Sequence, residues 1–362
     1  MAGPELKPAL EHAHHSPPES IRSLHKHYQK APVESLASDP RVLDFTNLSE
    51  FHRNRLRVVG KLGGSCLQKI FDTFESGAAG GQNIENKEAS LSQETEGRVD
   101  SLQFVPSLLP FSSQKALLSR LWMRDLSNPF HQTNLHLHYH IPYPNCETST
   151  FFGYDDPEKV LLQPKDPTTH KPLTVAQMMR KKLRWMTLGG QYDWTRKLYP
   201  EMDTTEARDL LLSLPHDTAT LIHSIFPSLH PQAAISNLYT PGDTLSPHRD
   251  ISEASSAPLA SISIGTDAIF IIGLSKGSPA ANEEEGRILV VRIKSGDVIL
   301  MGGESRWAWH SVPKIVPTNV GAKDNSLEEW PGSGDGGSGV NKLWAGWMKN
   351  RRVNLNVRQM WD

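Results

Sequence analysis

The spacing of apolar positions divides the chain into a helical first part and a strand-rich last part. Between residues 21 and 43 the apolar positions recur at intervals that predict one or two short helices. The same spacing predicts helices over residues 112–122, 205–214 and 219–225. We therefore expect the first part of the chain to supply mainly helices and the last part to supply the strands that they support.

After residue 234 the pattern changes to short β-branched or alternating runs separated by turn residues, which is typical of strands. The predicted strands are 235–239, 259–264, 268–274, 287–294, 297–301 and 353–360. Residues 294–297, Lys-Ser-Gly-Asp, predict a hairpin turn between two of them. Many short strands without intervening helices indicate a sandwich or small barrel, with a ligand site at its mouth.

Two stretches with almost no apolar residues suggest how the chain is divided. Residues 76–101 are rich in Gly, Glu, Gln and Ser, which predicts a disordered linker. Residues 1–75 before it are expected to be a polar tail followed by docking helices. Residues 102–362 then form the main folded domain, with a flexible Gly- and Ser-rich insertion over about 317–340.

Charge and composition limit the partners and the compartment. The formal net charge is −2, so any binding of nucleic acid must be local, for example at the basic stretches 180–184 and 349–352. No apolar run approaches the roughly 20 residues of a membrane span, and the N-terminus has no signal-peptide or transit-peptide character. The only cysteines, Cys66 and Cys146, are too few for a disulfide framework, which agrees with a reducing compartment. We therefore expect no membrane partner and a location in the cytoplasm or nucleus. The sequence does not determine the oligomeric state, for which a monomer is the expectation.

The strongest chemical signal is a His-x-Asp pair, His248 and Asp250, followed later in the chain by His310. Two imidazoles and one carboxylate make the facial triad that holds non-haem iron(II) and leaves positions open for a 2-oxo acid and dioxygen. The pair alone is weak evidence, because a turn with a capping aspartate has the same sequence. The C-terminal pattern makes the metal site the better interpretation.

Residues near the C-terminus alternate strictly between polar and apolar. On a strand, Arg352, Asn354, Asn356 and Arg358 share one face. That face lines either a wet cavity or an exposed edge. A buried arginine needs an anionic partner, and the planar fork of a guanidinium suits a small dicarboxylate.

A shorter motif repeats this logic upstream of His248. Asn237 and Tyr239 lie on one face of a predicted strand, where an amide and a phenol could complete a pocket for a 2-oxo acid. Taken singly, either residue could be structural.

Two other motifs lead to different sites. His136, His138 and His140 alternate and could chelate a metal from one strand, but no further ligand motif completes such a site. His-Arg-Asp also opens the catalytic loop of protein kinases. Ser255 stands where that loop needs asparagine, and no phosphate-binding glycine loop precedes it, so a kinase is excluded.

Three motifs occur in an order that resembles the AlkB family of nucleic-acid dealkylases. They are Asn237 with Tyr239, then His248 and Asp250 with His310, and finally the alternating polar run from Arg352 to Arg358. Residues 184–189 (Arg-Trp-Met-Thr-Leu-Gly), 268–270 (Ala-Ile-Phe) and 295–297 (Ser-Gly-Asp) look most like its AlkB homologue 1 branch. The resemblance covers about residues 102–362. It implies an α+β fold with a double-stranded β-helix (jelly-roll) core and supporting N-terminal helices.

The resemblance also implies the roles of the site residues. Iron(II) would be bound by the catalytic residues His248, Asp250 and His310, and 2-oxoglutarate and O2 would be the co-substrates. The residues that the family pattern assigns to 2-oxoglutarate are Asn237, Tyr239, Arg352, Asn354 and Arg358. Of these, Arg352 would pair with the distal carboxylate, and Arg358 would lie near both the co-substrate and the entering base.

The resemblance further implies that an aromatic residue ahead of the barrel and the first metal histidine flank the substrate base. Trp194 is the candidate and Tyr192 the second choice, with core packing of Trp194 as the alternative. The expected reaction is oxidative demethylation of N-methylated bases, of the methyladenine type, in single-stranded RNA, tRNA, mRNA or DNA. A protein substrate such as a methylated histone, or a non-catalytic nucleic-acid-binding module, are the competing hypotheses.

Overall fold

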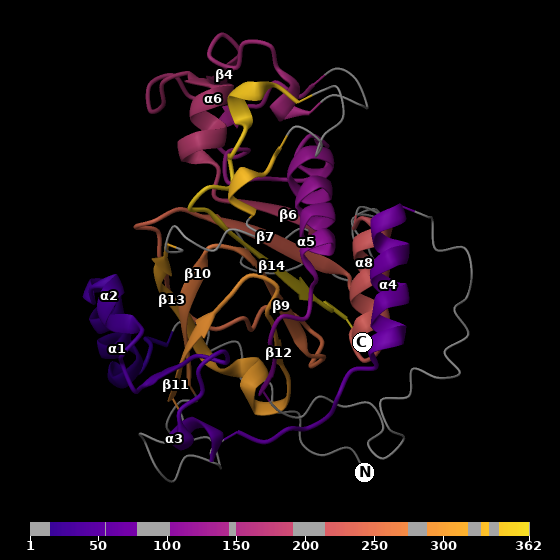
Figure 1. The fold of residues 1–362 in the computed structure, drawn as a ribbon. Helices are drawn as coiled ribbons and strands as arrows, with labels where there is room; N and C mark the ends of the chain where they lie inside the picture. Colours follow the sequence, from indigo (N-terminus) through magenta and orange to yellow (C-terminus); the bar gives the residue numbers. More distant parts are fainter. Residues whose placement is uncertain are drawn as a thin grey trace.

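The computed structural model describes residues 15–54, 56–77, 102–144, 150–190, 214–273, 288–317, 327–332 and 340–361, and the structural statements below concern these residues. Two sheets lie at its centre, and their strands are antiparallel except for one short parallel pair (Figure 1). In order across the first sheet, the strands are β2 (Leu102–Val105), β12 (Val298–Met301), β9 (Leu259–Gly265), β14 (Arg352–Arg358), β7 (Ala233–Tyr239) and β6 (Trp185–Gly189).

The second sheet has five strands in the described part of the chain. In order, they are β1 (Val42–Leu43), β11 (Ile288–Ile293), β10 (Asp267–Gly273), β13 (Trp309–Val316) and β8 (Leu245–His248). A hydrophobic cluster that includes Leu259 and Ile299 from the first sheet and Phe270 and Val291 from the second fills the space between them. This two-sheet arrangement with helices outside confirms the predicted α+β jelly-roll core.

The faces of the strands explain their sequences. In β14 the apolar positions Val353, Leu355 and Val357 belong to a large cluster on the outer face of the first sheet. Helices α4 (Gly64–Ser76), α5 (Phe111–Leu118) and α8 (His216–Ile225) contribute to the same cluster and lie along that side of the molecule (Figure 1). The polar positions of β14 must therefore face the interior between the sheets.

The N-terminal helices cover the second sheet. Helix α1 (Glu19–Lys30) and α2 (Val33–Leu36) bring Tyr28 and Leu36 onto Ile269 and Ile271 of β10 (Figure 1). Alternate residues of β10 face the inner cluster, so both faces of this strand are apolar and all seven of its residues are buried. The short strand β1 then extends the sheet by pairing in parallel with β11.

Smaller elements complete the fold. They are α3 (Glu50–Arg53), α6 (Val175–Gln177), π-helical segments Ser119–Asp125 and Met178–Lys182, 3-10 turns Phe151–Gly153, Gly303–Trp307, Leu327–Glu329 and Lys342–Trp344, and a small sheet of β3 (Tyr139–His140), β4 (Leu161–Pro164) and β5 (Leu173–Thr174). None of the described helices is long and apolar enough to span a bilayer.

The predicted hairpin at residues 294–297 is wrong. Gly296 has a φ of 87°, and the Asp297 carboxylate accepts from the Lys294 amide at 2.7 Å, so a tight turn is present. However, β11 pairs with β10, whereas β12 leaves the turn to pair with β9 and β2 of the other sheet. The turn is therefore a corner between the two sheets.

Some predicted segments lie outside the described residues. These include the helix over 205–213 and the linker from residue 78 onward. Within the predicted insertion 317–340, the described residues 327–332 include Trp330, which is buried and packs against Phe152. An aromatic anchor of this kind holds part of a Gly- and Ser-rich stretch against the fold.

Candidate metal centre

The chain brings His248, Asp250 and His310 together because strand β8 pairs with β13. His248 ends β8 and lies opposite His310 on β13, and Asp250 follows two residues after His248. One ligand atom from each of the three residues lies within 4.8 Å of the other two. Asp250 oxygens are 3.9 Å from Nε2 of His248 and 3.7 Å from Nε2 of His310.

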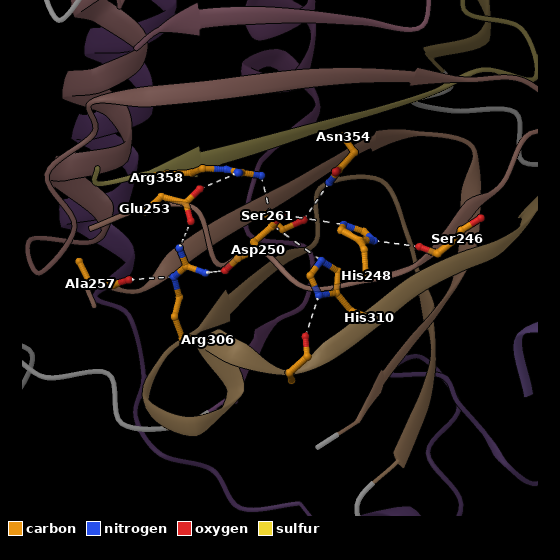
Figure 2. A network of polar contacts seen from close by, with 11 residues as sticks. Ser246, His248, Asp250, Glu253, Ala257, Ser261, Arg306, His310, Asn354 and Arg358 are labelled. Carbon is orange, nitrogen blue, oxygen red and sulfur yellow. Dashed lines mark hydrogen bonds and ion pairs between the residues drawn. The ribbon is translucent and has the colours of Figure 1, made fainter. Parts of the chain in front are cut away.

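Main-chain carbonyls orient both imidazoles (Figure 2). Nδ1 of His248 is 2.9 Å from the Ser246 carbonyl oxygen, and Nδ1 of His310 is 3.0 Å from that of Ala308. A carbonyl oxygen only accepts, so each Nδ1 carries the proton and each Nε2 keeps a lone pair for a metal. Burial lowers the pKa of His310 to about 4, so this ring is neutral at physiological pH.

The third ligand, Asp250, is ionised. Burial alone would raise the pKa of its carboxyl, but the charge of Arg358 holds that pKa well below its ordinary value. Two imidazoles, each with an Nε2 lone pair turned toward the same point, and one carboxylate fit a non-haem iron(II) ion. Among the described residues, these three are the one cluster that could hold a metal through three ligands.

Behind Asp250 lies a buried ionic network of three further residues (Figure 2). Arg358 donates to Asp250 Oδ2 at 3.1 Å and to Glu253 Oε1 at 2.7 Å. Arg306 donates to Glu253 Oε2 at 2.8 Å and to the Asp250 carbonyl at 2.5 Å. Sequence reasoning placed Arg358 near the co-substrate and missed Glu253 and Arg306, which lie outside any periodic segment.

Arg352 lies at the other end of β14 and is 2% exposed. Its Nη2 donates to Ser263 Oγ at 2.8 Å, while its Nε and Nη1 have no hydrogen-bond partner among the described residues. Two orphaned donors on a buried guanidinium fit the carboxylate of a ligand such as 2-oxoglutarate. Because β14 is a central strand between β7 and β9, the alternative of an exposed edge is excluded.

The other predicted pocket residues share this inner face. Tyr239 lies opposite Arg352, and Asn237 lies opposite Asn354, in the β7 and β14 register. The Asn354 amide nitrogen donates to Ser261 Oγ at 2.8 Å, which fixes its orientation. Burial raises the pKa of Tyr239 to about 12, so its phenol keeps its proton and can donate to a ligand. The structure therefore brings Asn237, Tyr239, Arg352 and Asn354 to one surface.

Two of the aromatic residues that could contact a substrate base cannot be placed, and a third can. Trp194 and Tyr192 lie outside the described residues. Trp185, which sequence reasoning quoted without assigning a role, lies on edge strand β6 directly opposite Asn237. Residues opposite each other in an antiparallel pair point to the same face, so this half-buried indole faces the side of the sheet that carries Arg352.

The alternating histidines 136, 138 and 140 do not form a shared metal site. His136 Nδ1 accepts from the Thr133 amide at 2.8 Å, and its Nε2 is 2.8 Å from the Tyr143 hydroxyl. His138 instead contacts His170, with 3.2 Å between ring nitrogens. No third ligand joins this pair among the described residues.

Comparison with known proteins agrees with this geometry. Residues 153–358 match the 2OG-Fe(II) oxygenase superfamily. The chain is 38% identical to an N6-methyladenosine RNA demethylase of Pyricularia oryzae, over 96% of this chain and 97% of that protein. It is 44% identical to an N6-methyladenosine RNA demethylase of Cryphonectria parasitica (63% and 100%), and 36% identical to a tRNA demethylase of Schizosaccharomyces pombe (74% and 83%).

The chain therefore belongs to the 2OG-Fe(II) oxygenase superfamily and is an enzyme that uses iron(II), 2-oxoglutarate and O2. Within this superfamily it belongs to the AlkB family, in the AlkB homologue 1 branch. The predicted family, reaction class and cofactors are confirmed.

Proposed function

We propose that this enzyme demethylates N-methylated bases, of the methyladenine type, in RNA or DNA, with RNA as the preferred substrate. The observation that carries the proposal is the cluster of His248, Asp250 and His310, which contacts the inner face of β14 through Arg358, the face that also carries Arg352 with its unpaired Nε and Nη1. The names of the relatives given above, all RNA demethylases, support the substrate class.

In this proposal each group has a defined task. The two Nε2 atoms and the Asp250 carboxylate hold iron(II), and the Nε and Nη1 donors of Arg352 bind the distal carboxylate of 2-oxoglutarate. Tyr239 and Asn237 supply further hydrogen bonds at that end of the pocket. Iron(II), 2-oxoglutarate and O2, when bound there, would supply the oxidising chemistry for hydroxylating the N-methyl group, whose carbon would then leave the base as formaldehyde.

A base must leave its stack to reach ligands as buried as these. Trp185 is suited to receive it, because an indole on the edge strand, opposite Asn237, offers a flat apolar surface at the border of the pocket. The exposed side chains of Arg180, Lys181 and Lys182 precede this strand and could contact phosphates. Single strands and loops of tRNA are therefore easier substrates than an intact duplex.

The test is formaldehyde release from RNA and DNA oligonucleotides containing methylated adenine, in the presence of iron(II), 2-oxoglutarate and O2. We expect turnover by the wild type and none by His248→Ala. His170→Ala is the matched control, because it removes a histidine of the exposed pair with His138. Absence of turnover on every methylated nucleic acid, with 2-oxoglutarate still consumed in the presence of a methylated peptide, would replace the proposed substrate with a protein.

A second experiment separates base binding from iron chemistry. We expect Trp185→Ala to raise KM for the oligonucleotide about tenfold, as loss of one stacking contact is worth about 1–3 kcal/mol. The affinity for 2-oxoglutarate should stay unchanged. An unaltered KM would show that Trp185 does not contact the substrate.

A further inference from the structure

A carboxylate with no surface exposure lies behind the metal ligands. Glu253 is 0% exposed, and the two arginines that contact it, Arg306 and Arg358, are 1% and 7% exposed. Charged side chains are rarely buried so completely unless they are paired and hydrogen-bonded. The contacts of this group therefore indicate what it does.

Glu253 connects two guanidiniums that both contact Asp250 (Figure 2). Its Oε1 accepts from Arg358, whose other Nη donates to the Asp250 carboxylate. Its Oε2 accepts from Arg306, whose other Nη donates to the Asp250 main-chain carbonyl. Asp250 is thus held at its side chain and at its backbone, and Glu253 is the group common to both supports.

The balance of charge near the metal ligands also depends on Glu253. Two buried guanidiniums next to a site for a divalent cation would repel that cation, and Asp250 alone supplies one negative charge against them. Glu253 supplies the second, so the four residues are neutral before a metal arrives. Removing one partner of a buried pair leaves the other charge uncompensated in a medium of low polarity.

We propose that Glu253 is a positioning residue for the metal centre. It orients the Asp250 carboxylate through Arg306 and Arg358, and it offsets their charge so that a divalent ion can bind. The inference rests on the iron site of the proposed function and adds a residue that acts on iron only through Asp250. It has a consequence in the protein without substrate, because metal binding alone should report the loss of Glu253.

The experiment measures binding of Co²⁺ to the purified full chain by titration calorimetry, together with the visible absorption spectrum of the Co²⁺-saturated protein. We expect Glu253→Gln, which keeps the shape and removes the charge, to weaken Co²⁺ binding about 10- to 100-fold, as is typical when a partner of a metal ligand is lost. The Co²⁺ spectrum should also shift, because the Asp250 ligand is no longer fixed in orientation.

Asp125→Asn is the matched control. Asp125 is also a buried carboxylate paired with an arginine, at 2.6 Å from Arg124, but it lies on the π-helical segment and not between the two sheets. We expect this variant to bind Co²⁺ with the affinity and spectrum of the wild type. The contrast separates a role at the metal from the general cost of removing a buried charge.

Three outcomes decide the proposal. Wild-type affinity and spectrum in folded Glu253→Gln would overturn it. If that variant does not fold, Arg306→Lys takes its place, because it keeps the net charge but cannot reach both Glu253 and the Asp250 carbonyl, and unchanged binding there would also overturn the proposal. Failure of the wild type itself to bind Co²⁺ would overturn the proposed function along with this inference.

Discussion

Strand β14 carries two buried arginines on one face, and their surroundings differ. Arg358 donates to the carboxylates of Glu253 and Asp250 at 2.7 and 3.1 Å. Arg352, six residues earlier, donates to the neutral hydroxyl of Ser263 and leaves Nε and Nη1 without partners among the described residues. The same side chain on the same strand is thus bonded directly to carboxylates at one end and has no directly bonded carboxylate at the other.

The difference shows which end of the site is complete in the protein alone. Near Arg358, charges of opposite sign are paired and hydrogen-bonded, so the metal ligand Asp250 is oriented before metal binds. Near Arg352, the buried guanidinium raises the free energy of the folded state until an anion pairs with it. Stability and ligand binding should therefore respond in opposite ways when each arginine is removed.

The largest expected effect is on the stability of the paired end. We expect Arg358→Met to lower the free energy of unfolding by about 3–5 kcal/mol, because Glu253 and Asp250 would lose a partner while staying buried. Urea denaturation of the metal-free protein measures this directly. A loss below about 1 kcal/mol would mean that the network adds little to the stability of the fold.

At the unpaired end we expect the opposite sign for stability. Arg352→Met should keep or raise the free energy of unfolding, because an apolar side chain replaces a buried charge that lacks an acidic partner. Affinity for 2-oxoglutarate should fall about 100-fold, or about 3 kcal/mol, through loss of charge-assisted hydrogen bonds. Calorimetric titration of the Co²⁺-loaded protein checks the second expectation.

Arg41→Met is the control for this substitution. Arg41 pairs with Asp39 at 3.1 Å in the segment that follows helix α2, and neither residue acts on Arg352, so its loss should leave the affinity for 2-oxoglutarate unchanged. If Arg352→Met bound 2-oxoglutarate as tightly as the wild type, the unpaired Nε and Nη1 of Arg352 would not be the binding site for its carboxylate, and the contrast between the two ends of β14 would not concern ligand binding.

The sequence predicted β14 well because strict alternation has one structural solution. Arg352 and Arg358 fall on one face and the apolar residues between them on the other, as a period of two requires. The metal ligands could be predicted from residue type and spacing. Their convergence depends on the pairing of β8 with β13, which local patterns do not encode.

The pattern of apolar residues did not predict the two strands that carry the metal-binding histidines, because each of these strands contains a proline. Pro313 interrupts the apolar pattern of β13, and proline inside a run argues against a strand. In the structure the register between β10 and β13 shifts at this point, so the residue without an amide hydrogen lies in a bulge. Pro247 lies in β8, which is an edge strand and tolerates the missing donor.

The residues that support the metal ligands could not be predicted from the sequence either. Glu253 follows β8 in a segment without regular structure, and Arg306 lies in a 3-10 turn, so neither belongs to a repeating pattern.

The corner at residues 294–297 was wrongly predicted to be a hairpin for a related reason. Turn chemistry fixes the local backbone, whereas the choice of sheet for the next strand depends on long-range pairing.

The smallest expected effect concerns a third kind of buried group, a histidine that is uncharged in the folded protein. His131 is 2% exposed, and its Nδ1 has no hydrogen-bond partner among the described residues. Burial, followed by the charge of Arg124, lowers its pKa from 6.5 to about 4. The folded state therefore resists a proton that the unfolded chain takes up below pH 6.5, and stability should fall as the pH drops from 6.5 toward 4.

By pH 5 this loss should reach about 2 kcal/mol. The wild type alone does not isolate it, because burial raises the pKa of Asp125 to about 6, and a carboxyl with a raised pKa gains stability as the pH falls through the same range. The measurement is the difference in free energy of unfolding between the wild type and His131→Gln at pH 7 and pH 5. We expect the variant to gain relative to the wild type at the lower pH, equally with and without Co²⁺ or 2-oxoglutarate, because His131 belongs to neither end of β14. A pH-independent difference would show that His131 titrates alike in both states.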